Sequence, residues 1–548
     1  MVHFEIDMKE GTMKKFKLKL GKVSDFMITC VFMLFFALFI ITLVGVVFIG
    51  NRLDYFEICK ITCLLDNKII FLVAVVLLGI WTGLGCFIRR IPFNKTGEYI
   101  AVFCIALIFT GMYFAGVEVS KCIAFYSGWD VSIVSGSAYN LFNNSGIEDF
   151  WYYSVYPNNV PICYFLYKLY DWAWYNPDYA YNAEFAWIQC NNLLMCVAGF
   201  ASCMTVKRLT HKLFPVITCL LLYIVCAFIT PWRIIPYTDM LAFAFPILSI
   251  CFYVYSATAR NAVWKYILFL LAGLFCAIGS IIKPPVLIVL FAVIIMELLV
   301  EKNWREIVIK ALLLVCVLFF RSSYTEYIYE ETEFIQNQEI TATYHHYFLM
   351  GLNEESTGGY YSPDFAMFGQ YATAGERIDA EIELAWERIC DKGVLGYPYF
   401  LFKKLVMCFN DGTFCWGKEG GFYFGDYQNL TDAGYKQLFR DIFWPDYRYC
   451  GRFNTFSQLS WFLVLGGILG NILYIKSEKK YLVGVVILTI LGSMFYLMLF
   501  EARSRYLLCF LSVWITFSAM GVDAILDILA KKIDERRNKK KMKDKECI

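Results

Sequence analysis

A small set of ionisable residues stands at the ends of long apolar stretches, where an unpaired charge is costly. Asp130 lies in the motif SGWD, Asp239 lies in PYTD, and Lys283 directly precedes two prolines. Arg503 and Arg505 lie in EARSRY, just before the last apolar stretch. A carboxylate can accept a proton from a nucleophile, and lysine or arginine can hold an anion. These residue types would suit a general base beside an anion-binding site.

Several of these residues have a structural alternative. Asp130 could be a solvated turn aspartate, because a glycine and an aromatic residue precede it. Asp239 and the threonine before it could cap a helix that begins there. Glu501 and Arg505 are four residues apart, a spacing that gives an ion pair on a helix and would leave Arg503 to meet an external anion.

Lys283 carries a sharper expectation. The two prolines after it suit the first turn of a helix, whose positive dipole end would then face the lysine. A lysine in that place is disfavoured unless an anion joins it. The alternative is a side chain that extends to the lipid headgroups.

Aromatic and amide side chains accumulate around the first of these carboxylates. Trp129 and Tyr156 belong to a dense aromatic region, which suits either an aromatic belt at the headgroup level or a platform for a sugar ring. Asn158 and Asn159 offer amide donors and acceptors suited to hydroxyl groups.

Two adjacent histidines, His345 and His346, are the remaining candidates. They lack neighbouring ligands at metal-site spacing, so substrate contact or ordinary packing is expected instead. No metal site is predicted, and no cofactor is expected. A divalent metal stays open as an alternative, although no carboxylate cluster accompanies Asp130.

The composition places these residues in a membrane protein. Of the 548 residues, 59% are apolar and 18% are charged, against roughly 45–50% and 25% in soluble proteins. The mean hydropathy is +0.55. The net charge is only +2, so no global field attracts nucleic acid. The predicted fold class is an all-α polytopic membrane protein.

Twelve apolar stretches approach the roughly 20 residues that a helix needs to cross a hydrocarbon core of about 30 Å. Lysine and arginine gather before the first stretch, in the even-numbered turns and in the tail, which places both chain ends in the cytoplasm. The candidate residues named above then all fall at the extracytoplasmic face of the cell membrane. The stretches lie near 26–49, 69–88, 99–119, 186–206, 213–230, 240–257, 265–282, 285–300, 307–320, 456–475, 481–500 and 506–529.

The same topology divides the chain into seven segments. They are a basic cytoplasmic N-terminus (1–25), three spans (26–119), extracytoplasmic loop A (120–185), six spans (186–320), extracytoplasmic loop B (321–455), three spans (456–529) and a basic cytoplasmic tail (530–548).

Both loops contain segments that predict short helices. In loop A, residues 160–175 are apolar but short and carry Lys168 and Asp171, which favours an interfacial helix. A thirteenth span there would reverse every later loop. In loop B, residues 375–392 have the pattern of an amphipathic helix.

The motifs together resemble the GT-C class of polytopic glycosyltransferases, especially bacterial relatives of the protein O-mannosyltransferase and aminoarabinose transferase group. They cover the chain from about residue 99 to 520 in a common order. The motifs are GWD (128–130), YPNN (156–159), YTD (237–239), KPP (283–285), HHYFLMGLN (345–353), DGTF (411–414) and EARSRY (501–506).

The resemblance implies a GT-C-like bundle and a reaction at the external face. A sugar would pass from a polyprenyl-phosphate carrier, with inversion, to an extracytoplasmic glycan, lipid or protein. Asp130 would be the general base, and Lys283, Arg503 and Arg505 would bind the donor phosphate. Membrane lipid is the other expected partner. The expected substrate contacts are Trp129, Tyr156, Asn158, Asn159, His345 and His346.

The chain departs from that family in two ways. Its members place the acidic loop directly after the first helix, whereas further helices precede loop A here. Val131 also follows Asp130, where the mannosyltransferases have a second acid. Asp239 is therefore kept as a reserve base.

Two other functions compete with an enzyme. A transporter or flippase for lipid-linked sugar or polysaccharide would explain twelve spans, but transporters tend to show repeated halves and midplane charges. A non-catalytic assembly partner of envelope proteins would tolerate the loss of Asp130.

Overall fold

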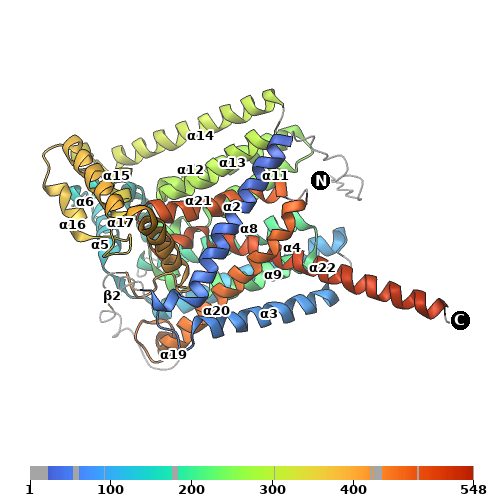
Figure 1. Ribbon diagram of the computed structural model, residues 1–548. Helices are drawn as coiled ribbons and strands as arrows, with labels where there is room; N and C mark the ends of the chain where they lie inside the picture. The colour runs from blue at the N-terminus through green and yellow to red at the C-terminus, as the bar shows by residue number, and fades with distance from the viewer. Residues whose placement is uncertain are drawn as a thin grey trace.

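Helices dominate the structure, as a chain that must satisfy its backbone hydrogen bonds inside a membrane requires. The computed structural model describes residues 22–53, 61–91, 93–147, 149–175, 183–301, 303–419, 422–423, 435–477 and 480–546 (Figure 1). The predicted N-terminal segment lies outside these residues up to position 21, and residues 547–548 of the predicted tail also lie outside them. The all-α polytopic fold class is confirmed.

Nine helices of the described part are long and apolar enough to cross a membrane. Two of them continue a short preceding turn of helix, α10 (Thr238–Leu241) before α11 and η10 (Ser504–Phe510) before α22. The nine are α2 (Lys22–Phe48), α3 (Asn67–Ile88), α4 (Lys95–Ile123), α8 (Ala183–Thr210), α11 (Phe245–Ala257), α12 (Ala262–Ile282), α14 (Trp304–Glu331), α20 (Cys450–Ile468) and α22 (Leu511–Glu546).

Three shorter apolar helices occupy the remaining predicted stretches. Their apolar segments are 10 to 17 residues long, and that of α21 is Val483–Leu499. They are α9 (Leu213–Tyr223) with η4 (Ile224–Phe228), η6 (Pro284–Val286) with α13 (Leu287–Val300), and α21 (Lys480–Leu499). All twelve apolar stretches of the sequence therefore fall on helices.

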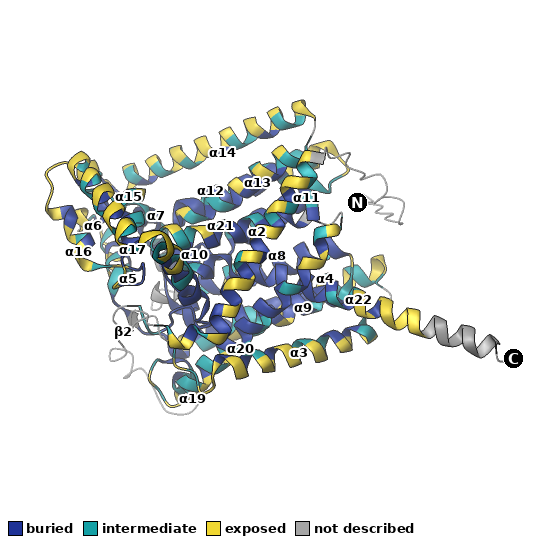
Figure 2. Ribbon diagram, in the orientation of Figure 1, coloured by how far each residue is buried: buried dark blue, intermediate teal, exposed yellow. Residues whose placement is uncertain are grey.

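The long helices lie side by side in one bundle with an inside and an outside. Helix α22 packs against α8, α9 and α20 in its interior. Figure 2 shows α8 and α9 largely buried, whereas exposed residues recur along much of α3 and α14. The exposed residues of α3 and α14 are mostly large and apolar, as a lipid-facing surface requires.

Short helices form a layer across one end of the bundle, at the left of Figure 1, opposite the end from which α22 projects. They come from loop A and loop B. They are α5 (Trp129–Phe142), α6 (Phe150–Val155), η3 (Pro157–Asn159), α7 (Val160–Tyr175), η7 (Gln338–Ile340), α15 (Tyr344–Gly351), α16 (Ser362–Phe365), η8 (Ala366–Gly369), α17 (Ala374–Phe409) and α19 (Tyr435–Phe443).

A short antiparallel pairing joins the two loops. The strands β1 (Tyr126–Ser127) and β2 (Phe422–Tyr423) are the only ones among the described residues, with Tyr126 opposite Tyr423. The residues just before Asp130 are thereby tied to loop B.

Two helices extend beyond their predicted ends. Helix α14 continues to Glu331, past the predicted boundary at 320. Helix α17 continues through a kink at Gly393, where φ is +64°, and its second half packs against α2 and α21. A Cβ on Gly45 of α2 would lie 2.5 Å from Val406 of α17, so the two helices are in close contact. Part of loop B thus belongs to the bundle.

The apolar segment 160–175 forms helix α7, which is 16 residues long and is not among the nine candidate spans. It packs against α5, α8 and α14, and Lys168 lies 3.9 Å from Glu331 at the end of α14. Its position in the end layer is compatible with the predicted interfacial helix, which stays a prediction.

Close packing of α22 depends on glycines at its crossing with the segment after α20. A Cβ on Gly470 would lie 2.0 Å from the carbonyl oxygen of Gly521, and a Cβ on Gly521 would lie 2.1 Å from that of Gly467. Since the obstacles are backbone atoms, no side-chain rotation can relieve them. Such small-residue contacts let membrane helices approach closely.

We predict that Gly521→Ala destabilises the protein by about 1–3 kcal/mol, because the helices must separate to admit the methyl group. Thermal unfolding of the purified protein in detergent or lipid measures the effect. Gly83→Ala on α3 is the matched control, since nothing lies within 4 Å of its added Cβ. Equal unfolding temperatures for the two variants would contradict the prediction.

Candidate active site

Asp130 lies in the first turn of α5, immediately after a strained residue. Trp129 has φ of +52°, a conformation that a bulky side chain rarely adopts and that costs energy. The carboxylate of Asp130 accepts a hydrogen bond from the hydroxyl of Tyr237 at 2.8 Å, and the hydroxyl of Tyr152 also hydrogen-bonds it. The backbone conformation at Trp129 thus directs the Asp130 carboxylate toward Tyr237, at the start of α10, and not into an exposed turn.

The pKa of Asp130 is raised above its ordinary value. Burial is the largest cause, while the Tyr237 hydroxyl and the positive charge of Arg505 act in the opposite direction. A carboxyl group with a raised pKa is a better proton acceptor once it is ionised. The environment therefore suits a general base.

Three charged residues from three different helix ends form what we call the Asp239 cluster, namely Asp239, Lys283 and Arg505. Lys283 Nζ lies 2.5 Å from Asp239 Oδ1, and Arg505 Nε lies 3.5 Å from Asp239 Oδ2. Asp239 is in the first turn of α10, Lys283 follows α12, and Arg505 is in η10. Each is less than a tenth exposed. The structure brings these predicted residues together.

The structural alternatives for Asp239 and Lys283 do not describe what these side chains do. Tyr237 occupies the position before α10 and makes no side-chain cap, while Asp239 contacts the two cations instead. Lys283 is 7% exposed and lies 4.7 Å from the ring centre of Tyr506, so it turns inward and does not extend to the headgroups.

Arg505 connects the Asp239 cluster to the surroundings of Asp130. Its guanidinium carbon lies 4.4 Å from the ring centre of Trp129 and 5.4 Å from that of Tyr237. These rings are 5.0 Å apart in an edge-to-face arrangement. A third acid, Glu419 of loop B, lies 3.8 Å from Arg505 Nε.

Two donors of this guanidinium have no hydrogen-bond acceptor among the described residues. They are the Nε and Nη1 groups of Arg505, both buried. The ion-pair contacts of Arg505 with Asp239 and Glu419 are too long or too poorly aligned to satisfy them. A buried charged donor without an acceptor is costly, and a bound anion would remove that cost.

Arg503 and Glu501 lie beside these residues in a different arrangement from the expected one. The segment 501–503 is not helical, and η10 begins only at Ser504, so Glu501 and Arg505 do not pair as helical neighbours. Burial raises the pKa of Glu501, and the charge of Arg503 and a hydrogen bond from Tyr506 oppose that rise. The expectation of a Glu501–Arg505 ion pair was wrong because it assumed a helix.

The aromatic and amide residues of loop A hold one another. Asn158 donates to Asn159 at 3.1 Å, and Asn159 donates to the hydroxyl of Tyr152 at 2.6 Å. Tyr156 packs edge-on to Tyr152 and stacks on Phe365 of loop B. The two asparagines thus reach Asp130 through Tyr152, and their direct contact with substrate stays a prediction.

The two histidines make their closest contacts with residues of loop B. His346 is fully buried, and its Nδ1 lies 3.0 Å from Glu381 of α17, while its ring packs against Phe368. His345 contacts Thr343 and the ring of Tyr344. These contacts match the packing alternative, because α15 turns His346 toward α17.

Three residues near the site were not identified from the sequence. Tyr237 precedes Asp239 by two positions in the YTD motif, which is the signal that could have revealed it. Tyr347 accepts the backbone N–H of Glu501 at 2.9 Å, and Glu419 stands in an ordinary loop sequence without any signal. Among the described residues no group of three or more His, Cys, Asp or Glu could hold a metal ion.

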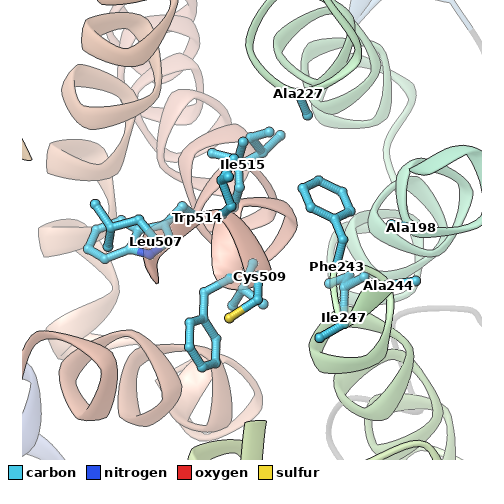
Figure 3. Close-up of a cluster of buried hydrophobic side chains, with 14 of the residues drawn as sticks. Ala198, Ala227, Phe243, Ala244, Ile247, Leu507, Cys509, Trp514 and Ile515 are labelled. Atoms are coloured by element: carbon cyan, nitrogen blue, oxygen red, sulfur yellow. The ribbon is translucent and has the colours of Figure 1, made fainter. Parts of the chain in front are cut away.

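An apolar core beneath the site fixes the helix ends that carry it. Figure 3 shows Leu507 and Cys509, which follow Arg505, across one cluster from Phe243 and Ala244, which follow Asp239. All four side chains are fully buried. This apolar packing fixes the distance between the two segments independently of their charged contacts.

Comparisons with known proteins give a family but no reaction. A family model described as "Conserved hypothetical integral membrane protein" matches residues 20–525. No curated protein matches. The structure of ArnT from Cupriavidus metallidurans bound to undecaprenyl phosphate is similar, with 10% identity over 79% of this chain and 78% of that chain and a TM-score of 0.27.

We predict that Lys283→Met destabilises the protein by roughly 3 kcal/mol, because the buried carboxylate of Asp239 keeps only its longer contact with Arg505. The double variant Lys283→Met with Asp239→Leu should recover part of that loss, since it removes the uncompensated charge as well. Thermal unfolding of both variants measures the effect.

The control for this comparison is Lys121→Met, which removes an exposed ion pair with Glu118 and should change stability by less than about 1 kcal/mol. Additive losses in the double variant would show that the cluster is not a coupled unit.

Proposed function

Because this chain belongs to the family of conserved hypothetical integral membrane proteins, whose description names no reaction, we propose from its site that it is a membrane glycosyltransferase. It would move a sugar from a polyprenyl-phosphate carrier to an acceptor hydroxyl or amine, at the extracytoplasmic face. The observation that carries the proposal is the buried Arg505, with two donors that lack acceptors, between the Asp239 cluster and Asp130.

The proposed chemistry assigns one role to each side of Arg505. The oxygen or nitrogen atom of the sugar acceptor attacks the anomeric carbon, and Asp130 takes up the proton that this atom loses. The bond from that carbon to the phosphate oxygen breaks, and its electron pair stays on the phosphate. Arg505 and Lys283 meet the charge that develops there, with Arg503 beside them. Attack opposite the leaving group inverts the anomeric centre.

The location supports a donor that is anchored in lipid. Asp239, Lys283 and Arg505 all lie where a spanning helix begins or ends. Short helices cover this side, because α12 contacts α7 and η3, and η10 contacts α17. A carrier whose tail remains among the spanning helices could present its phosphate at that level. A soluble sugar nucleotide would need no such position.

The charge balance of the site bears on anion binding. The site has four carboxyl groups and three cations, so its net charge is −1 when all are ionised. Binding of an anion would therefore be favoured if one carboxyl group took up a proton. The carboxyl groups are Asp130, Asp239, Glu419 and Glu501, and the cations are Lys283, Arg503 and Arg505. Burial raises the pKa of both Glu501 and Asp130, and the proposal requires that the proton sits on Glu501. Asp130 then stays available as the base.

The decisive test is sugar transfer by purified protein in lipid, from a panel of labelled polyprenyl-phosphate sugars. We expect the wild type to release polyprenyl phosphate and Asp130→Asn to be slower by roughly 10²–10⁴-fold, because the general base is lost. Asp171→Asn, also in loop A, is the matched control and should retain full activity.

The other outcomes distinguish the rival functions. Passage of the lipid-linked sugar across the bilayer without transfer would replace this proposal with a transporter. Equal activity of wild type and Asp130→Asn would keep the enzyme class and move the base to Asp239.

The pH profile gives an independent check of the base. Activity should rise with pH as Asp130 loses its proton, because only the carboxylate can accept one. The Tyr237 hydroxyl favours the ionised form, so Tyr237→Phe should raise the pKa of Asp130 further and move the rising limb to higher pH. Tyr139→Phe, an exposed change on the same helix, should leave the profile in place. A shift toward lower pH in Tyr237→Phe would refute the assignment.

A further inference from the structure

We propose that Lys404 of α17 is a positioning residue that fastens the segment carrying Arg503 to the turn Gly351–Gly359 of loop B. The inference rests on the transferase proposed above, in which Arg503 stands beside the donor phosphate. We call this set of contacts the Lys404 junction, made of Lys404 and the carbonyl groups of Gly351, Met498 and Phe500.

Lys404 uses all of its hydrogen-bonding capacity on backbone carbonyl groups. Its Nζ donates to Gly351 at 2.6 Å, to Phe500 at 2.8 Å and to Met498 at 3.0 Å. The side chain is fully buried. A lysine ammonium has three donors, and here each has its own acceptor.

The acceptors lie at the C-terminal ends of two helices. Helix α15 ends at Gly351, and α21 ends at Leu499, so Met498 and Phe500 flank its last residue. Carbonyl groups at a helix C-terminus lack partners within the helix and carry the negative end of its dipole. One buried ammonium therefore caps two helices and joins them at the point where the chain turns toward Arg503.

Two backbone hydrogen bonds continue the same connection along the segment. Glu501 donates its N–H to Tyr347 at 2.9 Å, and Ala502 donates its N–H to Gly358 at 2.8 Å. The residue after Ala502 is Arg503. The connection from α21 to η10 is thus held from loop B on both sides of Glu501.

Adjacent glycines bring the turn against both cations. Gly358 has φ of +76°, and a Cβ there would lie 2.5 Å from Lys404 Cε. A Cβ on Gly359 would lie 2.7 Å from Arg503 Cζ. Only glycine allows the backbone to approach both side chains this closely. A shift of the turn would therefore move the surface on which the Arg503 guanidinium rests.

The first experiment follows amide hydrogen exchange of the segment 498–502 and needs no enzymatic activity. Lys404→Met keeps most of the side-chain length and removes the donors, so amide exchange in this segment should rise roughly 10- to 100-fold. It is measured near pH 6, because burial lowers the pKa of Lys404 to about 7 and the protonated form makes all three bonds.

The matched control is the preceding lysine. Lys403 pairs at 3.1 Å with the exposed Glu354 of the same turn, so Lys403→Met removes one positive charge and one surface contact with the turn but leaves the three carbonyl hydrogen bonds of the junction in place. Its exchange in 498–502 should equal that of the wild type. Unchanged exchange in Lys404→Met would overturn the inference.

A second variant covers the case in which Lys404→Met does not fold. Gly358→Ala adds a methyl group against Lys404 Cε in a backbone conformation that alanine rarely adopts. It should raise exchange in the same segment while distant helices keep their protection. A uniform increase across the protein, or none at all, would count against the junction.

The second experiment asks whether Lys404 acts through Arg503, with a double-mutant cycle on sugar transfer. Arg503→Gln and Lys404→Met should each lower kcat/KM for the lipid-linked donor, but Lys404→Met should cost little once Arg503 is already Gln. If the fold-losses in kcat/KM of the two single variants multiply in the double variant, Lys404 acts independently of Arg503 and only stabilises the fold.

The two experiments separate this inference from the proposed function. If the wild type transfers no sugar, the proposed function fails, and the exchange data still decide whether the junction exists. If Arg503→Gln transfers sugar as fast as the wild type, Lys404 is not a positioning residue for the donor.

Discussion

A buried charge needs an opposite charge or a full set of hydrogen-bond partners, and this constraint organises the end of the bundle that carries the site. Asp239 is almost fully buried and lies between Lys283 and Arg505, which come from two other helix ends. Removing any one of the three would leave a charge in a low-dielectric environment, where it costs several kcal/mol. The helices therefore cannot shift independently, and the position of Arg505 relative to Asp130 follows from this cluster.

The aromatic residues extend the same constraint to Asp130. Arg505 lies against the rings of Trp129 and Tyr237, and the hydroxyl of Tyr237 binds the Asp130 carboxylate. The left-handed backbone at Trp129 stores strain that the surrounding packing must hold. One guanidinium thus connects a carboxyl group with a raised pKa to a second cation, and the three groups keep a fixed arrangement before any substrate arrives.

The sequence predicted the helices well because a lipid environment leaves few alternatives to a helix of about 20 apolar residues. It also predicted that the helix ends carrying Asp239, Lys283 and Arg505 share one side, because lysine and arginine mark the opposite side, and the structure brings these three residues into contact. The sequence failed to predict contacts that depend on the direction of a side chain, because the residue type alone does not give that direction. His346 turns toward Glu381, which is 35 positions away in the chain, and no local pattern announces that contact. The Glu501–Arg505 pair failed because spacing predicts a contact only if the intervening residues are helical. Lys404 lies in the largely apolar second half of α17, and the carbonyl groups that it binds belong to the backbone, which sequence patterns do not reveal.

The contrast between two buried cations supports interpreting the Asp239 cluster as a binding site. Lys404 satisfies each of its donors with a carbonyl group and needs nothing further. Arg505 is similarly buried, yet two of its donors have no acceptor among the described residues, although two carboxylates lie nearby. A residue selected only for packing would be expected to resemble Lys404, because an unsatisfied charged donor lowers stability. Arg377 of α17 also keeps one buried donor, Nε, without an acceptor. Arg505 has two such donors and lies between Asp130 and Lys283, which favours a partner that binds from outside. Its neighbours, a carboxylate base on one side and a lysine on the other, make an anionic leaving group the partner that fits best.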